Sequence, residues 1–547
     1  MFSNFSTYFI DAFSDTKKNI FNKDNTSITN FHNSNLFWKE IFNYSLFLLP
    51  IGLVFGEVPT SVSEIIVFIC WLLTGEWDKK IKLLKHNFYF WLTSSLYLIS
   101  IFGLIYTKDF QYAFNDLRIK LPLLLFPIIL FSVDFIKYKH FVLFLKWTSI
   151  VTFINLFYLW LNFKLRPYAY ADARETSIFI SHIRLGLIAA FSIISAVYLV
   201  INEIISLKEK LFFLIISGIS FSIMLSLGLM TGIMTLLITS LFALIYMIIK
   251  SPDKLYFRII TLVTICTFGL LSFYIYEIHK RFFSTIRSNE LLSHSKNGCK
   301  YWHNINDSYA ENGYSVNINI CDDELKKIWT KRSALAFEGK DKKGNDLKYT
   351  VYRYLTSKGL TKDSLGLSQL SDKDIRNIEC GIPNYLLADA NFFEKRIYEL
   401  FQEYHYFKVN KNPQGKTIAM RMLYWKIGFQ IWQEHWFLGV GTGDIKDAFN
   451  KVYQEKYTYI PKNEQLRTHN QILTYAISFG IIGFVLILLN VVYPLVNLRT
   501  SQNFMMYYLF SIITVISFLI DDTLETQPGV TFYALFNTLL IRWLKEK

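Results

Sequence analysis

Charged residues are scarce in this chain, because Asp, Glu, Lys and Arg make up only 18% of its 547 residues. Hydrophobic residues account for 52%, and 50 Phe and 34 Tyr contribute to an aromatic content of 18%. A soluble protein of this length rarely carries so little charge. The apolar residues also gather into long blocks, which excludes an ordinary soluble protein and indicates a polytopic membrane protein.

Several signatures of binding and catalysis are missing as well. The sequence has no Walker loop, HExxH, CxxC or GxSxG motif, so it points to no nucleotide, tightly bound metal or serine hydrolase. The run GVGTG at 439–443 is a fragment of a dinucleotide fingerprint, but it follows an amphipathic helix and no strand. The first 40 residues show no cleavable signal peptide, so the first apolar block is expected to be an uncleaved anchor.

The apolar blocks predict an all-α membrane protein with about twelve transmembrane helices, each near the ~20 residues that a bilayer requires. Two of these spans are short, and three prolines (Pro50, Pro122 and Pro127) fall within spans, where they are expected to kink the helix. The expected spans are 42–56, 61–76, 88–106, 121–135, 141–162, 183–202, 211–227, 230–249, 258–277, 471–496, 504–520 and 529–543.

The short loops between these spans predict the orientation. One alternating set carries most of the Lys and Arg, so this set and both termini are expected to be cytoplasmic. The last short loop of the other set is acidic, with Asp521, Asp522 and Glu525. The net charge of +14 is interpreted as this orientation signal and as affinity for phosphate; no nucleic acid is expected as a partner.

This orientation puts one large loop outside the cytoplasmic membrane. The predicted parts are a cytoplasmic segment (1–41), nine spans (42–277), a mainly helical extracytoplasmic loop domain (278–467), and three spans ending at a cytoplasmic C-terminus (468–547). The loop is too rich in Tyr, Trp and Leu to be a disordered linker. It contains Cys299, Cys321 and Cys380; one disulfide of unknown pairing and three free thiols both fit the sequence.

Residues 421–483 hold the densest group of candidate site residues. Arg421 and Trp425 share one face of a predicted helix, which is expected to stop near Gly439. Asp444 is a plausible N-cap for the next helix. Arg467, His469 and Asn470 then fall just before a long apolar run, so a cation, an imidazole and an amide lie at the mouth of a span.

Other basic residues lie near predicted span ends on the same side of the membrane, namely Arg118, Lys120 and Arg184. Arginine offers a planar fork of donors that suits a phosphate or pyrophosphate on a lipid. Residues at span ends also snorkel to headgroups without a further role, which is the alternative for Arg118 and Lys120. His182 likewise fits a polar anchor at the interface.

The stretch RMLYWKIGFQIW…FLGVGTGD…HNQIL…GIIGF resembles the core of the O-antigen ligase family of lipid-linked glycan transferases. The order of an Arg-x-x-x-Trp helix, a GVG-type turn and His-Asn before a span matches that family. The runs DKDIRNIECGIPNYLL, RIYELFQEY and ISHIRLGL are similar to a Bacteroidetes-type branch.

The resemblance implies a GT-C-like enzyme of the bacterial inner membrane, with its site facing the periplasm. Such an enzyme moves a glycan from undecaprenyl pyrophosphate to an acceptor, with no cofactor, metal or nucleotide sugar. It implies that Arg421 and Arg184 hold the pyrophosphate and that His469 lies beside the acceptor hydroxyl; Arg467 and Asn470 are further candidates. The family's Ser-Arg-Gly step is absent from LSLGLMTGIM (225–234), so Arg174 or Arg118 is expected to supply that contact.

The acceptor stays open at this point. Ligation to lipid A-core is favoured, and polymerisation of repeat units and transfer to protein are alternatives on the same scaffold. From another class, a transporter of twelve spans is opposed by the scarcity of charge within spans and by a large late loop that breaks repeat symmetry. A purely structural membrane scaffold does not explain the Arg and His residues.

Overall fold

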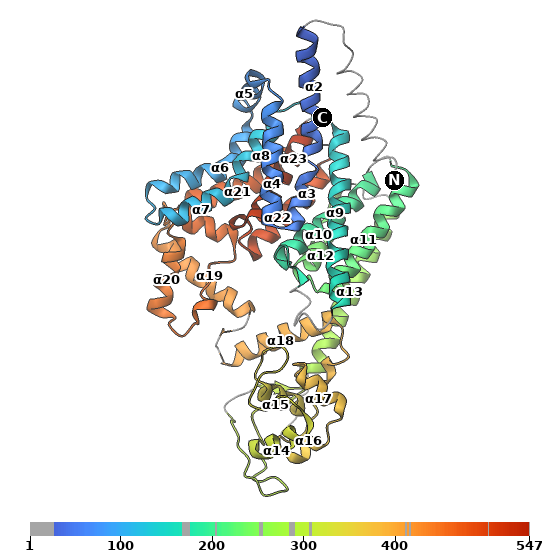
Figure 1. Ribbon diagram of the computed structural model, residues 1–547, viewed down its shortest axis with the longest axis vertical. Coiled ribbons are helices and arrows are strands. Elements are labelled where there is room, and N and C mark those ends of the chain that lie inside the picture. Colours follow the sequence, from blue (N-terminus) through green and yellow to red (C-terminus); the bar gives the residue numbers. More distant parts are fainter. Residues whose placement is uncertain are drawn as a thin grey trace.

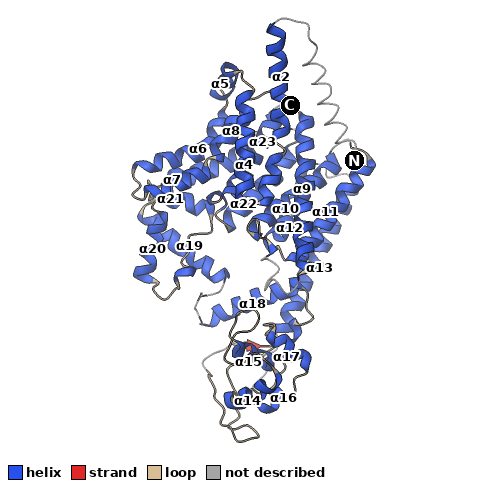
Figure 2. Cartoon of the chain, in the orientation of Figure 1, coloured by secondary structure: helices blue, strands red, loops and turns tan. Residues whose placement is uncertain are grey.

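The computed structural model describes residues 27–166, 176–202, 205–250, 255–283, 290–305, 309–410, 413–414, 417–501 and 503–545. The described chain is mostly helical, and one two-stranded antiparallel sheet pairs β1 (Ala310–Glu311) with β2 (Tyr314–Ser315) (Figure 2). The helices form a large bundle and a smaller lobe that projects from one end of it (Figure 1). The prediction of a mostly helical protein is confirmed.

The bundle is built from both ends of the chain. Its first helices are α2 (Ser27–Ser45), α3 (Leu48–Phe55), α4 (Glu57–Leu73), α5 (Trp77–Lys85), α6 (Phe88–Phe102) with η1 (Gly103–Ile105), α7 (Phe110–Lys120), α8 (Pro122–Phe131), α9 (Tyr138–Leu165), α10 (His182–Asn202), α11 (Leu207–Leu227), α12 (Met230–Lys250) and α13 (Leu255–Phe283). Its last are α21 (Gln471–Asn497), α22 (Phe504–Ile520), η5 (Thr523–Glu525) and α23 (Gln527–Lys545). The centre is α10, which packs against α9, α11 and α12.

Each of the twelve expected spans overlaps a helix of the bundle. Among the described residues, six helices are long and apolar enough to cross a membrane: α6 with η1, α9, α10, α11, α12 and α21. The pair α4 and α5, bent by 112°, makes a seventh if it is one span. The structure therefore supports an integral membrane protein, and the count of twelve stays a prediction.

The expected span at 42–56 is divided in two. A turn separates α2 from α3, and Pro50 lies in the first turn of α3, where its missing N–H is tolerated. At 1.5 Å per residue, the eight residues of α3 rise only about 12 Å, which is too short to cross a bilayer alone. Pro122 similarly begins α8, while Pro127 lies inside that helix.

The lobe has a core of its own, in which Trp329, Val351 and Leu355 are buried. It consists of β1, β2, α14 (Asp322–Arg332), α15 (Leu347–Ser357), α16 (Ser364–Ser368), α17 (Asp372–Glu379) and η3 (Tyr385–Leu387). A disulfide joins Cys299 to Cys321, and Cys380 is free, which answers the question of pairing. Glu324 lies near the two bonded sulfur atoms, which are not available as thiolate ligands for a metal.

Three helices connect the lobe to the bundle. They are α18 (Phe392–Asn410), α19 (Thr417–Glu434) and α20 (Ile445–Lys456), followed by η4 (Lys462–Glu464). Helix α18 packs against α13, whereas α19 packs against α21 and α20. Figure 1 shows α19 and α20 beside the α6, α7 and α21 side of the bundle, away from the lobe.

Candidate functional site

The turn between α19 and α20 joins a break in α21. The backbone of α21 leaves helical geometry at Phe479 and at Gly480, whose φ is 60°. The break frees backbone groups, and the turn pairs with them: Val440 N donates to Ile477 O and Gly441 N donates to Ser478 O, both at 2.9 Å. Ile481 N in turn donates to Trp436 O at 2.8 Å. Broken helices in membranes require such internal partners.

Glycine makes this close approach possible. A Cβ on Gly480 would lie 2.1 Å from Phe437 O, and a Cβ on Gly439 would lie 2.4 Å from the Ser478 backbone. Both residues also have positive φ, at 60° and 77°, which glycine adopts without strain. The GVGTG run is therefore a packing device between two backbone segments, in agreement with its rejection as a nucleotide site.

The same turn is bound on its other side to the end of α6 and the start of α7. Thr442 donates to Ser100 O at 2.6 Å, and Gly443 N donates to Thr107 Oγ1 at 2.7 Å. The Asp444 carboxylate accepts from the backbone N–H groups of Lys108 and Asp109. Asp444 occupies the N-cap position of α20, as predicted, but its side chain makes no capping bond to that helix and binds the start of α7 instead.

His469 stands at the end of this assembly, just before α21. Its φ of 47° is unusual for a residue other than glycine, and its neighbours hold it there. Asn470 caps α21 by accepting from Leu473 N at 3.0 Å, which gives it a structural role. The Asp522 carboxylate accepts from Asn470 N and from the Thr474 hydroxyl, at 3.1 and 2.7 Å. The His469 backbone is thus fixed from both sides.

Asp521 brings two of the candidate residues together. Its carboxylate lies 3.4 Å from His469 Nδ1 and 3.3 Å from the Arg184 guanidinium. Burial pushes the pKa of Asp521 up, but the hydrogen bond with His469 and the charge of Arg184 outweigh this and hold it below its usual range. Asp521 is therefore ionised, and an Nδ1–H directed at it leaves Nε2 of His469 as the basic nitrogen.

Arg421 approaches the same group from α19. It is half-buried, and within the described chain its guanidinium forms no hydrogen bond or ion pair, although Asp521 and Asp522 act on it electrostatically. Burial lowers the pKa of Arg421. Tyr424, three residues along α19, lies against the His469 ring with centroids 5.8 Å apart, so Arg421 and His469 border one region.

Arg184 has an unused donor in this region. One terminal nitrogen meets Asp521, whereas Nε is buried and has no hydrogen-bond partner within the described chain. A buried N–H without an acceptor is costly, on the order of 1–3 kcal/mol. Arg421 and Arg184 therefore present unmatched donors that an anionic group would satisfy.

Arg467 is already occupied. Its guanidinium lies 3.2 Å from Glu525 and donates to the Tyr112 hydroxyl at 2.9 Å. Glu525 also meets Lys120 at 2.9 Å, and Lys120 meets Asp116 at 2.8 Å. Burial opposes ionisation of Glu525, but Lys120 and Arg467 hold its pKa well below the usual range. Two cations and two carboxylates thus form one closed network beneath the His469 region.

Two predicted arginines remain, Arg118 and Arg174. Arg118 is exposed and donates to Asn115 on its own helix, at 2.9 Å. Arg174 falls outside the described residues. The structure brings together His469, Arg184 and Arg421, while Asn470 and Arg467 hold the surrounding backbone.

Sequence reasoning missed the carboxylates that organise this site. Asp521, Asp522 and Glu525 were recognised only as an acidic loop, yet each contacts a different part of the site. Three carboxylates between two apolar helices are rare enough to be a signal, because charge at a membrane boundary is generally paired or functional.

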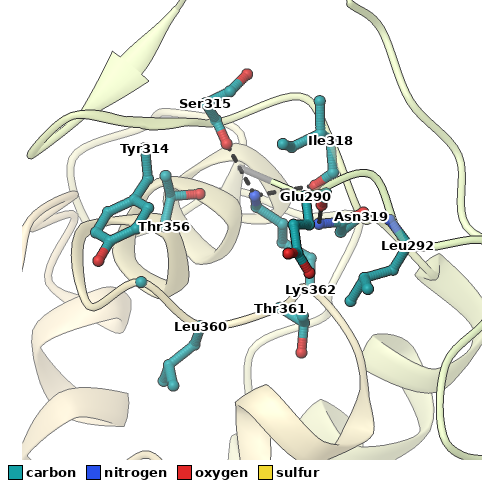
Figure 3. Close-up of a pocket in the computed structure, with 11 residues that line it drawn as sticks. Glu290, Leu292, Tyr314, Ser315, Ile318, Asn319, Thr356, Leu360, Thr361 and Lys362 are labelled. Atoms are coloured by element: carbon teal, nitrogen blue, oxygen red, sulfur yellow. Dashed lines mark hydrogen bonds between the residues drawn. The ribbon is translucent and has the colours of Figure 1, made fainter. Parts of the chain in front are cut away.

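The lobe contains a separate cavity of about 250 Å³ (Figure 3). Lys362 is buried in its wall and donates to the carbonyl groups of Ser315 and Ile318, at 3.1 and 3.0 Å. Burial lowers the pKa of Lys362 to about 7. These bonds tie β2 and the loop that follows it to the segment before α16, so Lys362 has a structural role apart from the His469 region.

Comparison with known proteins finds a family match over part of this region. A family model described as O-antigen ligase matches residues 386–488, which include α19, the glycine turn, His469 and the break in α21. Asp521 and Arg184 lie outside the matched range. No curated protein matches the chain.

Proposed function

Because this chain belongs to the O-antigen ligase family, we propose that it moves a glycan from undecaprenyl pyrophosphate to an acceptor at the membrane surface. The acceptor that we favour is lipid A-core. The single observation that carries this proposal is that Arg184 and His469 meet at Asp521, with unmatched donors on Arg184 and on Arg421, which borders the same region. A cationic region beside a basic nitrogen suits transfer from a pyrophosphate.

In the proposed reaction, Arg421 and Arg184 bind the pyrophosphate oxygens and stabilise the charge that develops as this group leaves. Arginine supplies this stabilisation without a metal ion or a cofactor. Arg184 gives up part of its contact with Asp521 or uses its free Nε. Arg118 and Arg174 are further proposed contacts to the donor.

His469 serves as the proposed general base. The acceptor hydroxyl oxygen attacks the anomeric carbon, its proton passes to Nε2, and the carbon–oxygen bond to pyrophosphate breaks with the electron pair staying on oxygen. A single displacement inverts the configuration at the anomeric carbon. Asp521 keeps the ring oriented and stabilises the imidazolium that forms.

We further propose that the site faces the periplasm and that both termini are cytoplasmic. The lobe and the end of α23 lie at opposite ends of the molecule, which supports this orientation (Figure 1). A reporter that works only outside the cytoplasm should be active when fused at Lys342, and a cytoplasmic reporter at Lys82. A cytoplasmic Lys342 would overturn the assignment.

Deletion of the gene followed by analysis of surface glycans tests the function. Loss of capped lipopolysaccharide, with lipid-linked glycan accumulating, is the expected result. Loss of chain length alone would identify a polymerase, and loss of glycoprotein a protein glycosyltransferase. Unchanged glycans of all three kinds would contradict glycan transfer and favour a transporter. Complementation with His469→Asn should fail, and with Lys426→Ala it should succeed.

A further inference from the structure

Helix α19 is apolar on two opposite faces. One face, with Tyr424, Ile427 and Ile431, is buried against α20 and α21. The other is exposed: Ile418, Met422, Trp425 and Phe429 are 46, 56, 39 and 49% accessible. Their spacing of four, three and four residues places them in one stripe along the helix. An exposed stripe of large apolar side chains in a loop domain calls for a partner.

The stripe continues past the end of α19. Trp436, Phe437 and Leu438 at the tip of the glycine turn are 57, 56 and 42% exposed. The backbone of this tip is nevertheless well paired, since Trp436 O accepts from Ile481 N and Leu438 O accepts from the Tyr106 hydroxyl. A non-helical segment can lie in hydrocarbon only if its backbone polar groups are paired within the protein and its exposed side chains are apolar. The tip has both of these features.

The tip also adjoins surfaces of two apolar spans. The bond from Tyr106 places Leu438 next to the end of α6, where Phe102 and Ile105 are exposed. The bond from Ile481 places Trp436 next to α21, where Ile482 and Val485 are exposed. Both spans belong to the apolar helices able to cross a bilayer. Exposed apolar side chains therefore adjoin the spans at the tip and recur along α19, with exposed Gln433, Glu434 and His435 between the two groups.

We propose that α19 lies in the membrane interface and that its stripe and the 436–438 tip are inserted among the acyl chains of the bilayer. The partner is the lipid bilayer itself. Polar Lys426 and Gln433 flank the stripe on one side and Arg421 on the other, as in helices that lie in the interface plane. This changes the expected division at 278–467, because α19 leaves the loop domain and joins the membrane part.

One consequence concerns Arg421. A helix whose stripe contacts acyl chains holds its flanking residues at the depth of lipid headgroups. Arg421 is then at the level where a phosphate on any membrane lipid is found. The insertion itself rests only on the membrane character of the chain, and it does not depend on glycan transfer.

Spin labels on the full chain in lipid nanodiscs test the insertion. Labels are placed by Met422→Cys and Phe429→Cys in a background where Cys70, Cys266 and Cys380 are replaced by Ala and the disulfide is kept. Collision with oxygen, which partitions into lipid, is compared with collision with a water-soluble nickel chelate. Leu489→Cys on α21 is the lipid-facing control, and Lys426→Cys on α19 is the matched polar control.

The labels at 422 and 429 should match the label at 489 and favour oxygen severalfold, while the label at 426 favours the chelate. Labels in the stripe that favour the chelate would show an aqueous face and overturn the proposal. Labels shielded from both reagents would also overturn it, because they would indicate a protein partner or a second copy.

Tryptophan quenching gives a second measurement that keeps all cysteines. Bromine atoms on the acyl chains of the vesicles quench tryptophans that lie among those chains. Trp425 and Trp436 should be quenched, so the Trp425→Phe and Trp436→Phe variants should each lose less fluorescence on bromination than the wild type. Trp302, a tryptophan of the lobe that is as exposed as Trp436, should be unquenched, so Trp302→Phe should remove unquenched fluorescence. Equal behaviour of the three variants would contradict insertion, whatever the glycan-transfer activity of the chain.

Discussion

Lys120 lies 2.9 Å from Glu525, and both side chains are almost fully buried although they come from opposite ends of the chain. Lys120 is the last residue of α7, and Glu525 lies in the short turn between α22 and α23. This ion pair anchors the turn between α22 and α23, which also contains Asp521 and Asp522. The position of His469 therefore depends on a contact that it does not itself make.

Lys120→Met should destabilise the protein strongly. It leaves Asp116 and Glu525 buried with one cation between them, and breaking a buried pair generally costs about 3–5 kcal/mol. A second substitution, Asp116→Asn, restores charge balance with Arg467 and should recover part of the loss. Thermal unfolding in detergent measures both. Lys373→Met, which breaks an exposed pair with Asp389, is the control and should cost about 0–1 kcal/mol. A harmless Lys120→Met would refute the network.

His469→Asn should lower turnover by about 10²–10⁴-fold, the usual contribution of a general base. Asn is chosen because it tolerates the left-handed backbone at this position, so the loss reports on chemistry. Donor-lipid binding, measured separately, should change little, since the arginines hold the pyrophosphate. EDTA should have no effect. A variant that transfers glycan normally would remove His469 from the reaction.

Asp521→Asn should reduce turnover on the order of 10²-fold, because the His469 ring loses its orienting carboxylate. Donor binding should be retained or improved, since Arg184 is released.

The lowered pKa of Asp521 also determines the direction in which pH changes the stability of the fold. Its ion pairs stabilise the fold above the ordinary pKa of about 3.9 and are lost as pH falls through the lower folded value. The melting temperatures of wild type and variant should therefore converge in acid.

Arg421→Lys should weaken donor binding about 10- to 100-fold despite the conserved charge, because Lys lacks the planar fork. Arg184→Ala should act in the same direction. Binding of a pyrophosphate-bearing lipid to purified protein is the readout. Lys426→Ala on the same helix is the matched control and should leave affinity unchanged. Wild-type affinity in the Arg421 variant would indicate recognition of the lipid tail alone.

Lys362 predicts a pH dependence of the lobe. Its pKa falls to about 7 in the folded state, so between pH 7 and 10 the unfolded chain binds a proton that the folded lobe does not. Stability of the lobe should thus rise with pH over this window, by a few kcal/mol at most at about 1.4 kcal/mol per pKa unit. Lys362→Met should flatten the slope. The pH dependence of lobe stability is measured by hydrogen exchange of the α15 amides in the full chain, corrected for intrinsic exchange rates. Equal pH slopes for the wild type and Lys362→Met would exclude Lys362 as the cause.

Sequence patterns predicted the elements of this fold better than their contacts. Apolar blocks located the helices, because hydrophobic runs of this length have few other uses. The order Arg421, glycine turn, His469 also placed most of the candidate site in one segment. Periodicity could not reveal that Asp521 faces His469, since the two belong to different helix ends. For the same reason the sequence did not reveal that Lys120, interpreted as a cation at a span end, and Arg467, predicted to bind substrate, are both paired with Glu525.

The break in α21 was also beyond sequence reasoning. Gly480 and Gly483 read as an ordinary small-residue step within an apolar run. Only the position of the 436–441 turn explains why helix geometry stops there, because the turn supplies the missing hydrogen bonds. The break at Phe479 and Gly480 can therefore be predicted only together with the 436–441 turn that pairs with it.

The lobe has a hydrophobic core that is separate from the residues around Asp521. The lobe closes its own core and disulfide, and it meets the bundle through an apolar cluster that joins α13 to η3 and α18, with Ile278, Phe282 and Tyr398 buried. None of the residues around Asp521 lies in either cluster. We therefore expect that the lobe can be replaced as a unit, with the α13–α18 contact kept, without moving the residues around Asp521.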